Sequence, residues 1–123
     1  IPEGQMEMGM GIHGEPGIYK SPVKTANEIV DEMMARLAAD RAFGGRMSIL
    51  ANSLGATPVE ELYIMYGRAA AILRDAGAEI VMPLVGRYAT SMEMTGATIT
   101  VCHLDDELEA LLRAPCDCAF WRV

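Results

Sequence analysis

The sequence predicts an α/β fold, a two-layer domain in which a mixed sheet is covered by helices on one face. Two observations carry this prediction. Short segments with the two-residue apolar period of strands alternate along the chain with longer segments whose apolar residues recur at helical spacing. The chain is 51% apolar and 22% charged, which indicates one globular domain, residues 1–123, with a sizeable core.

The first predicted strand leads into a glycine-rich stretch that holds a histidine. Apolar side chains occupy alternate positions, namely Met6, Met8, Met10 and Ile12. His13 therefore falls on the opposite face, which Gly9 and Gly11 leave nearly bare, and a strand glycine often marks the close approach of a ligand. We expect Glu15-Pro16-Gly17 to form a type II turn with Gly17 at positive φ. His13 is the first candidate for a functional residue.

The stretch Gly9–Gly14 also matches the GxGxxG pattern of dinucleotide-binding proteins. In those proteins the last glycine opens a helix whose N-terminus binds the pyrophosphate. Here Pro16, Gly17 and Pro22 follow too closely for a helix to start. We therefore reject a dinucleotide site.

The first helix is expected to follow a connector, Ile18–Val23, and to end near Ala39. Its start is set either by Ser21-Pro22 or by a capping box of Thr25 and Glu28. An apolar stripe at helical spacing forms its inner face: Ile29, Val30, Met33, Met34 and Leu37. On the same helix, charged residues such as Glu32 are expected to face water.

The middle of the chain predicts a strand, a loop and a second helix. The strand is expected over Arg46–Asn52 and the loop over Ser53–Ala56. Thr57-Pro58-Val59-Glu60 is typical of a helix start with Thr57 as the cap, and Gly77 is expected to end this helix.

Two further strands and a short helix complete the prediction. A strand over Ala78–Val85 contains Pro83, which places the strand at a sheet edge or bends it. A long loop, Gly86–Gly96, leads to a strand over Ala97–Leu104, and Asp105 is expected to cap the last helix. The prediction thus comprises four strands and three helices.

Four motifs occur in the order in which one known family has them: Gly9–Gly17, Asn52–Pro58, Thr90–Gly96 and Leu104–Leu108. On these motifs, which span nearly the whole chain, the sequence resembles the C-terminal half of the K subunit, or K domain, of dihydroxyacetone (glycerone) kinases. The resemblance implies a mixed sheet with helices on one face. It also implies a fragment whose N-terminal half is absent, in agreement with a start that lacks methionine.

The resemblance implies a catalytic role for His13. In that family the histidine of the first motif attacks the substrate ketone and holds it as a covalent hemiaminal. The glycines around it, Gly11 and Gly14 among them, leave space for a three-carbon substrate and are the other expected substrate-binding residues. The family's aspartate and second histidine lie in the preceding half.

The resemblance also implies where the phosphoryl donor binds. ATP and magnesium, or a phosphoprotein relay, belong to a separate L domain or subunit, so that this domain binds no cofactor of its own. Its implied partners are a small ketose such as dihydroxyacetone, the missing half of the K subunit, the L component and a second copy in a homodimer.

The residues alone leave alternatives for each candidate. His13 is either a nucleophile or a turn histidine that bonds nearby backbone, and Glu15 either orients its ring or is a solvated turn residue. The loop Asn52–Pro58 reads first as a capped turn before a helix, and secondly as part of a substrate or subunit contact. Thr90-Ser91-Met92 is either loop structure or interface.

Two clusters that resemble metal sites are set aside. Cys116-Asp117-Cys118, even with Cys102 or His103, lacks the two ligand pairs of structural zinc. Three successive acidic residues, Asp105–Glu107, are typical of a helix start rather than of a magnesium site. We therefore predict no metal in this domain.

The composition argues against two classes of partner. A formal charge of −7 argues against nucleic acid and anionic membranes, and no apolar run is long enough for a membrane span. Three cysteines, an odd number, favour a reducing cytoplasm.

The sequence thus predicts the substrate-anchoring part of a dihydroxyacetone-type kinase that is inactive as an isolated domain. The alternative is a non-catalytic ketose sensor or coactivator that kept the binding domain, and a third possibility is an oligomerisation domain. The phosphoryl donor and the choice between triose and tetrose stay open.

Overall fold

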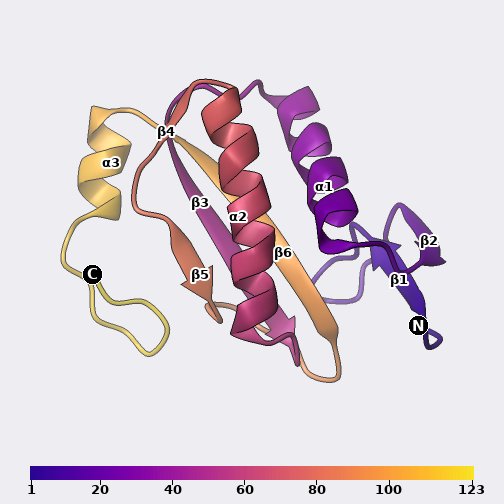
Figure 1. Cartoon of the computed structure of the whole chain (residues 1–123). Coiled ribbons are helices and arrows are strands. Elements are labelled where there is room, and N and C mark those ends of the chain that lie inside the picture. The colour runs from indigo at the N-terminus through magenta and orange to yellow at the C-terminus, as the bar shows by residue number, and fades with distance from the viewer.

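The computed structural model describes residues 1–123 as a four-stranded sheet, two long helices on one of its faces, a separate two-stranded hairpin and a short third helix (Figure 1). The α/β fold with helices over one face of a mixed sheet is therefore confirmed. The elements are β1 (Gln5–Met8), β2 (Tyr19–Pro22), α1 (Ala26–Asp40), β3 (Gly45–Gly55), α2 (Val59–Asp75), β4 (Ala78–Ile80), β5 (Leu84–Gly86), β6 (Thr95–Leu104) and α3 (Asp106–Leu112).

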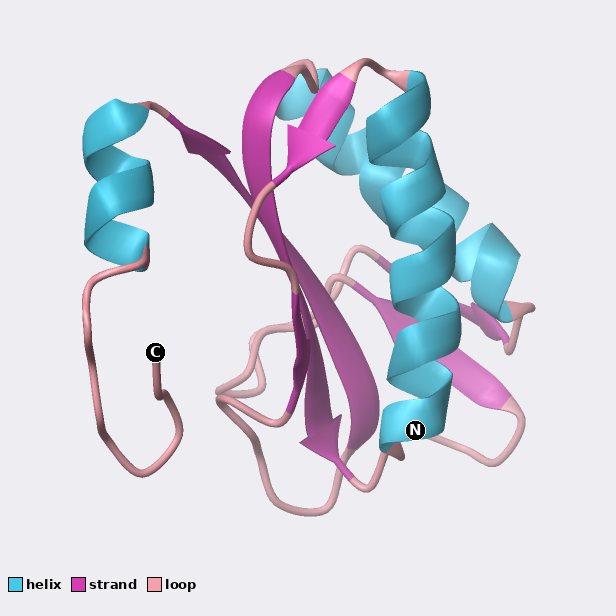
Figure 2. Ribbon diagram, turned by 60° about the vertical axis from the view of Figure 1, so that its left-hand side comes forward, coloured by secondary structure: helices cyan, strands magenta, loops and turns pink.

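The long strand β3 is the centre of the main sheet. It pairs antiparallel with β6 along its whole length, which brings Gly55 opposite Thr95. Its other edge pairs in parallel with two short strands, β4 and then β5 (Figure 2). The strand expected over Ala78–Val85 is thus two strands. Met82, at φ 51°, and Pro83, which has no N–H to donate, interrupt the pairing. Each of the two short strands pairs only with β3, so that both are edge strands, which is one of the two outcomes that Pro83 predicted.

The core lies between this sheet and the helices α1 and α2. The main core cluster takes fully buried side chains from α1, β3 and α2, among them Val30, Met34, Met47, Ile49, Ala69 and Leu73. The predicted stripe of α1 is confirmed, because Val30 and Met34 are buried and its other members pack against the same cluster. None of the three helices combines the length and the apolar character that crossing a membrane would require.

The start of α1 follows the second of its two predicted forms. The Thr25 hydroxyl accepts a hydrogen bond from the Glu28 N–H, and the Glu28 carboxylate accepts one from the Thr25 N–H. The Ser21-Pro22 alternative is wrong, because these residues belong to β2. The connector predicted over Ile18–Val23 is therefore wrong over Tyr19–Pro22, because so short a strand carries no clear apolar period.

The start of α2 differs from its prediction. Strand β3 continues through Ser53 to Gly55, and the helix begins at Val59 with Pro58 as N-cap and no side-chain cap. Thr57 is buried instead, and its carbonyl accepts a hydrogen bond of 2.7 Å from the Ser53 hydroxyl. At the other end Gly77 takes φ +80° and donates its N–H to the Arg74 carbonyl at 2.9 Å, so that the predicted stop is confirmed.

Helix α3 lies beside the sheet rather than over it (Figure 1). Asp105 caps it as predicted, accepting a hydrogen bond of 2.8 Å from the Leu108 N–H. Arg46 of β3 pairs with Asp106 and Glu109, and these ion pairs hold the helix against the strand. Asp106, one of the acids considered for magnesium, therefore has a structural partner.

Candidate functional site

His13 lies in a loop between the two strands of the hairpin. β1 and β2 pair antiparallel, ending with Met8 opposite Tyr19, and the loop between them begins with Gly9 at φ +74°. The positive φ takes the backbone out of the extended conformation and so ends the strand. Glycine adopts this conformation more readily than other residues. The expectation that the alternation continues to Ile12, with His13 on a strand face, is therefore wrong.

A tight turn at the tip of this loop presents the histidine. The Gly14 N–H donates to the Gly11 carbonyl at 3.0 Å, and the Gly11 N–H donates to the Glu15 carbonyl at 3.0 Å. Gly14 takes φ +86°, whereas Gly17 lies outside the left-handed region. The turn is thus Gly11–Gly14 and not the type II turn expected at Glu15-Pro16-Gly17. It is the three-residue form in which a turn is followed by a left-handed glycine.

Glu15 is the closest charged group to the His13 ring. Its Oε1 lies 3.6 Å from His13 Nδ1, and its Oε2 accepts a hydrogen bond of 3.1 Å from the His13 backbone N–H. Hydrogen bonds from the backbone N–H of Glu15 itself, and then from that of His13, hold the pKa of the Glu15 carboxyl below its ordinary value. An ionised carboxylate therefore faces Nδ1, while the side chain of His13 is 85% exposed.

Of the two glycines named as substrate-binding residues, one is covered and one is open. A Cβ at Gly11 would lie 1.9 Å from Glu15 Oε2, so that the Glu15 carboxylate fills the space that the sequence suggested was bare. A Cβ at Gly14 would meet no atom within 4 Å. The substrate-binding roles of Gly11 and Gly14 stay predictions.

A polar cluster ties the hairpin to the helical layer. The Tyr19 hydroxyl donates to Glu32 Oε2 on α1, and Lys24 Nζ donates to the same oxygen at 3.0 Å. Arg36 pairs with the other oxygen at 2.9 Å. The hydrogen bond from Tyr19, followed by those from Arg36 and Lys24, lowers the pKa of Glu32 to about 2. Glu32 thus does not simply face water, and it connects the His13 hairpin to α1.

The pH dependence of stability should reveal this cluster. Since the pKa of Glu32 falls from 4.5 to about 2 on folding, its contribution is complete above pH 4.5 and is lost as the pH falls from there through about 2. The stability difference between the parent and Glu32→Gln, measured by urea denaturation, should be constant near neutrality and shrink in acid. Tyr19→Phe, which removes the main cause of the lowered pKa of Glu32, should move this loss to higher pH. A difference that is the same at every pH would contradict the assignment.

Two of the sequence motifs meet at the end of β3. The Asn52 side chain accepts hydrogen bonds from the Tyr88 and Ala89 N–H groups, at 2.8 and 3.1 Å, and donates to the Ala89 carbonyl at 2.7 Å. The Thr90 hydroxyl accepts from the Gly55 N–H at 2.8 Å. These contacts join the loop at 52–58 to the loop at 87–94, which supports the structural interpretation of both motifs.

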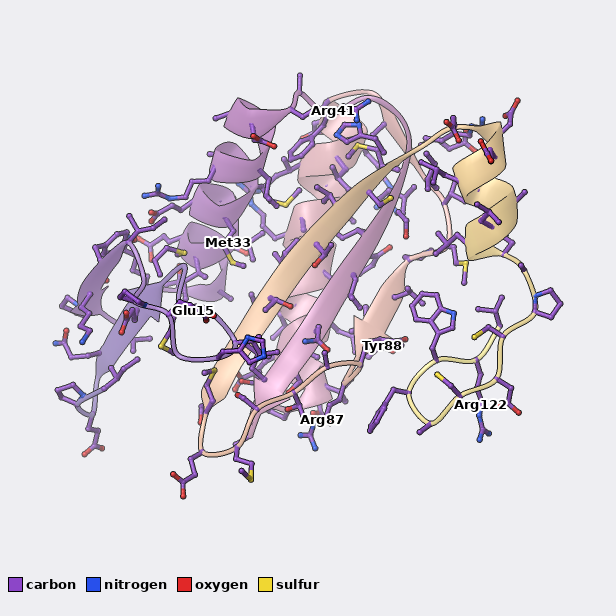
Figure 3. All side chains as sticks on the ribbon, turned by 180° about the vertical axis from the view of Figure 1, so that it is seen from behind. Glu15, Met33, Arg41, Arg87, Tyr88 and Arg122 are labelled. Atoms are coloured by element: carbon purple, nitrogen blue, oxygen red, sulfur yellow. The ribbon has the colours of Figure 1, made fainter.

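Arg87 and Tyr88 directly follow β5, near the end of β3. Figure 3 views the sheet from the face away from the helices and shows Glu15 on the β6 side, with Arg87 and Tyr88 on the other side of the strands. A hollow of about 260 Å³ lies between the start of α2 and Arg87 and is lined by residues such as Thr57 and Pro58. Arg87 donates to the Gly55 carbonyl at 2.6 Å and so helps to close the loop.

The cysteines do not converge on a common site with His103. Cys102 and His103 are successive residues of β6 and therefore point to opposite faces of the sheet. Cys102, Cys116 and Cys118 are exposed free thiols. The last two lie in a C-terminal turn whose Trp121 ring packs at 5.7 Å from the ring of Tyr88. Burial, and then the charge of Arg41, lowers the pKa of His103.

Comparison with known proteins places these features in a family. The Dak1 domain family matches residues 1–120. The dihydroxyacetone-binding subunit DhaK of a PTS-dependent dihydroxyacetone kinase from Listeria innocua is 47% identical over 98% of this chain and 37% of its own length. L-Erythrulose kinase of Pectobacterium atrosepticum is 40% identical over 99% of this chain and 22% of its own length.

A solved structure with the same fold belongs to a different functional class. The dihydroxyacetone kinase operon co-activator Dha-DhaQ superimposes with a TM-score of 0.83 and 28% sequence identity, over 94% of this chain and 37% of that one. The chain thus spans well under half the length of the relatives that it matches.

Proposed function

Because the chain belongs to the Dak1 domain family, we propose that it is the ketose-binding part of a dihydroxyacetone-type kinase, in which His13 holds the ketose as a covalent hemiaminal. One observation carries the proposal. The His13 imidazole is exposed at the tip of a tight turn, with a carboxylate beside Nδ1 and nothing of similar charge beside Nε2. This arrangement suits a nitrogen nucleophile that must reach a carbonyl.

The tautomer of the ring determines which nitrogen reacts. A negative carboxylate at 3.6 Å favours the proton on Nδ1, which leaves the lone pair on Nε2. Nε2 then attacks the carbonyl carbon of the ketose, and the C=O π electrons move to oxygen, which takes up a proton. The ring releases its Nδ1 proton, so that the net step adds N–H across C=O and gives a neutral hemiaminal.

The covalent step selects substrates by chemistry. Ketones and aldehydes form the adduct, whereas a polyol such as glycerol has no carbonyl to attack. The relatives' names include dihydroxyacetone, a triose, and L-erythrulose, a tetrose, and both combine a ketone with neighbouring hydroxyl groups. We therefore propose a short ketose as substrate, phosphorylated on a hydroxyl that the anchored ketone presents.

The phosphoryl donor is proposed to come from outside this chain. ATP with magnesium, or a phosphoprotein relay, would be presented by a separate L component, and this chain would contribute the anchored hydroxyl. The remaining acid-base groups would come from the part of the K subunit that precedes this domain in the relatives. The isolated chain is therefore expected to bind a ketose without turning it over.

A carbon NMR titration of dihydroxyacetone labelled at the carbonyl tests the anchor directly. With the full-length protein that carries this chain, the ketone signal should convert to that of a tetrahedral carbon bound to protein. His13→Ala should abolish the conversion, and His103→Gln, which changes the histidine of β6, should retain it. Conversion that survives in His13→Ala, or that is absent from the parent protein, would overturn the proposal.

The structural similarity to the co-activator supports a second candidate function, that of a ketose sensor without phosphoryl transfer. It shares the fold at a TM-score of 0.83, and a ketose sensor would need the anchor but no phosphoryl transfer. The two functions separate in one assay, in which the full-length protein is mixed with an L component and a phosphoryl donor. Formation of a ketose phosphate identifies the kinase, and adduct formation without phosphate identifies the sensor.

A further inference from the structure

The contact between Glu15 and Gly11 indicates a function for both residues. We propose that Glu15, seated in the space that Gly11 leaves free, is a positioning residue that holds His13 with Nδ1 toward the carboxylate and Nε2 toward the substrate. This inference rests on the proposed function of His13, and it assigns to Gly11 the role of admitting the carboxylate rather than the ketose.

The backbone of the turn fixes the carboxylate relative to the ring. The Glu15 carbonyl accepts from the Gly11 N–H at 3.0 Å, which closes the turn across its base. Its Oε2 accepts from the His13 N–H at 3.1 Å, and its Oε1 is then left 3.6 Å from Nδ1. The backbone of Glu15 thus bonds to Gly11 and its side chain to His13, so that the carboxylate moves with the turn that presents His13.

The charge of the Glu15 carboxylate favours one of the two neutral tautomers of the His13 ring. A carboxylate has only acceptor oxygens, so that it is complemented by a protonated Nδ1 and opposed by an Nδ1 lone pair. A neutral ring carries one proton, and placing it on Nδ1 leaves Nε2 as the nucleophile. Without this partner the ring would be free to take the other tautomer and to rotate, because 85% of its side chain is exposed.

Gly11 is required by the carboxylate and not by its own backbone. A Cβ built on Gly11 would lie 1.9 Å from Oε2, 2.7 Å from Cδ and 2.8 Å from Cβ of Glu15, and all three closest atoms belong to that side chain. The backbone of Gly11 is outside the left-handed region, so that alanine could adopt it. Gly14 shows the opposite combination, φ +86° with open space. Alanine at position 11 should therefore act through displacement of Glu15.

The first test reads the tautomer without any ketose. Nitrogen NMR of the full-length protein with labelled histidine, at a pH where the ring is neutral, distinguishes Nδ1–H from Nε2–H, and His13→Ala assigns the signal. The parent should carry mainly Nδ1–H. Glu15→Ala and Gly11→Ala should both lower that fraction, whereas Glu15→Asp should partly restore it relative to Glu15→Ala.

The second test measures adduct formation in a double-mutant cycle. Glu15→Ala and Gly11→Ala should each weaken the dihydroxyacetone adduct by roughly tenfold, by analogy with the loss seen when the carboxylate partner of a metal-binding histidine is removed. The double variant should be no weaker than either single variant, because both changes remove the same contact. Thermal melting of each variant checks that the fold is retained.

The outcomes separate this inference from the proposed function. An unchanged tautomer and adduct in Glu15→Ala would overturn the positioning role while leaving His13 as the anchor. Additive losses in the double variant would overturn the role assigned to Gly11. An adduct that persists in His13→Ala would overturn the proposed function, and the tautomer measurement would still decide whether Glu15 controls the ring.

Discussion

In the kinase proposed above, His13→Ala is expected to remove the preference for ketoses over polyols. The hemiaminal can form only with a carbonyl, so that the bond to His13 contributes to the binding of dihydroxyacetone and nothing to that of glycerol. Loss of the covalent anchor should lower kcat/KM for dihydroxyacetone on the order of a hundredfold, whereas any residual rate with glycerol should hardly change. The ratio of the two values therefore falls by about the same factor.

The measurement is phosphorylation of each substrate by the full-length protein with its L component. His103→Gln is the matched control, because it alters the other histidine of this chain, on β6, and should retain the preference. Equal losses with dihydroxyacetone and glycerol in His13→Ala would indicate general damage to the site. That result would contradict selection through the carbonyl.

The helices could be predicted because their signals are local. The capping box of Thr25 and Glu28 and the stop at Gly77 depend on residues a few positions apart, and both appear in the structure as expected. The predicted start of α2 was wrong although its signal is also local, because Thr57 is buried and bonded to Ser53 through its carbonyl instead of capping the helix. Tertiary packing there overrides a favourable local sequence.

The candidate site around His13 could also be predicted only in part from the sequence. The motif around His13 predicts a functional role for this residue, which stays a prediction, but neither the end of β1 nor the position of the tight turn followed from the sequence. Four glycines surround His13, and any of them could take the left-handed conformation; the structure places it at Gly9 and Gly14 and not at Gly17. The choice depends on hydrogen bonds across the loop, which periodicity does not encode.

The anchoring of the hairpin was missed for a related reason. Tyr19 and Glu32 are far apart in the sequence, and nothing in the spacing of either one predicts the hydrogen bond that joins β2 to α1. Glu32 looked like one of several solvated acids on a helix. The signal that could have found it is the tyrosine and lysine clustered just before the helix, at Tyr19 and Lys24.

Gly55→Ala is expected to be among the most destabilising single changes in this chain. Gly55 takes φ +72°, and a Cβ there would lie 2.0 Å from the Met94 carbonyl oxygen, which is backbone and cannot swing away. That oxygen already accepts a hydrogen bond of 2.8 Å from the Ala56 N–H. The left-handed conformation should cost about 1 kcal/mol and the clash about 2 kcal/mol more, or about 3 kcal/mol in the free energy of unfolding.

Gly77→Ala separates these two costs. Gly77 has nearly the same conformation, φ +80°, but a Cβ there would meet no atom within 4 Å. It should therefore lose only the conformational part, about 1 kcal/mol, in the same urea denaturation experiment. Equal losses in the two variants would show that the Met94 carbonyl yields to the new methyl group. A loss about threefold larger for Gly55→Ala would show that the joint between β3 and the loop at 87–94 is rigid and that the Met94 carbonyl is held in one position.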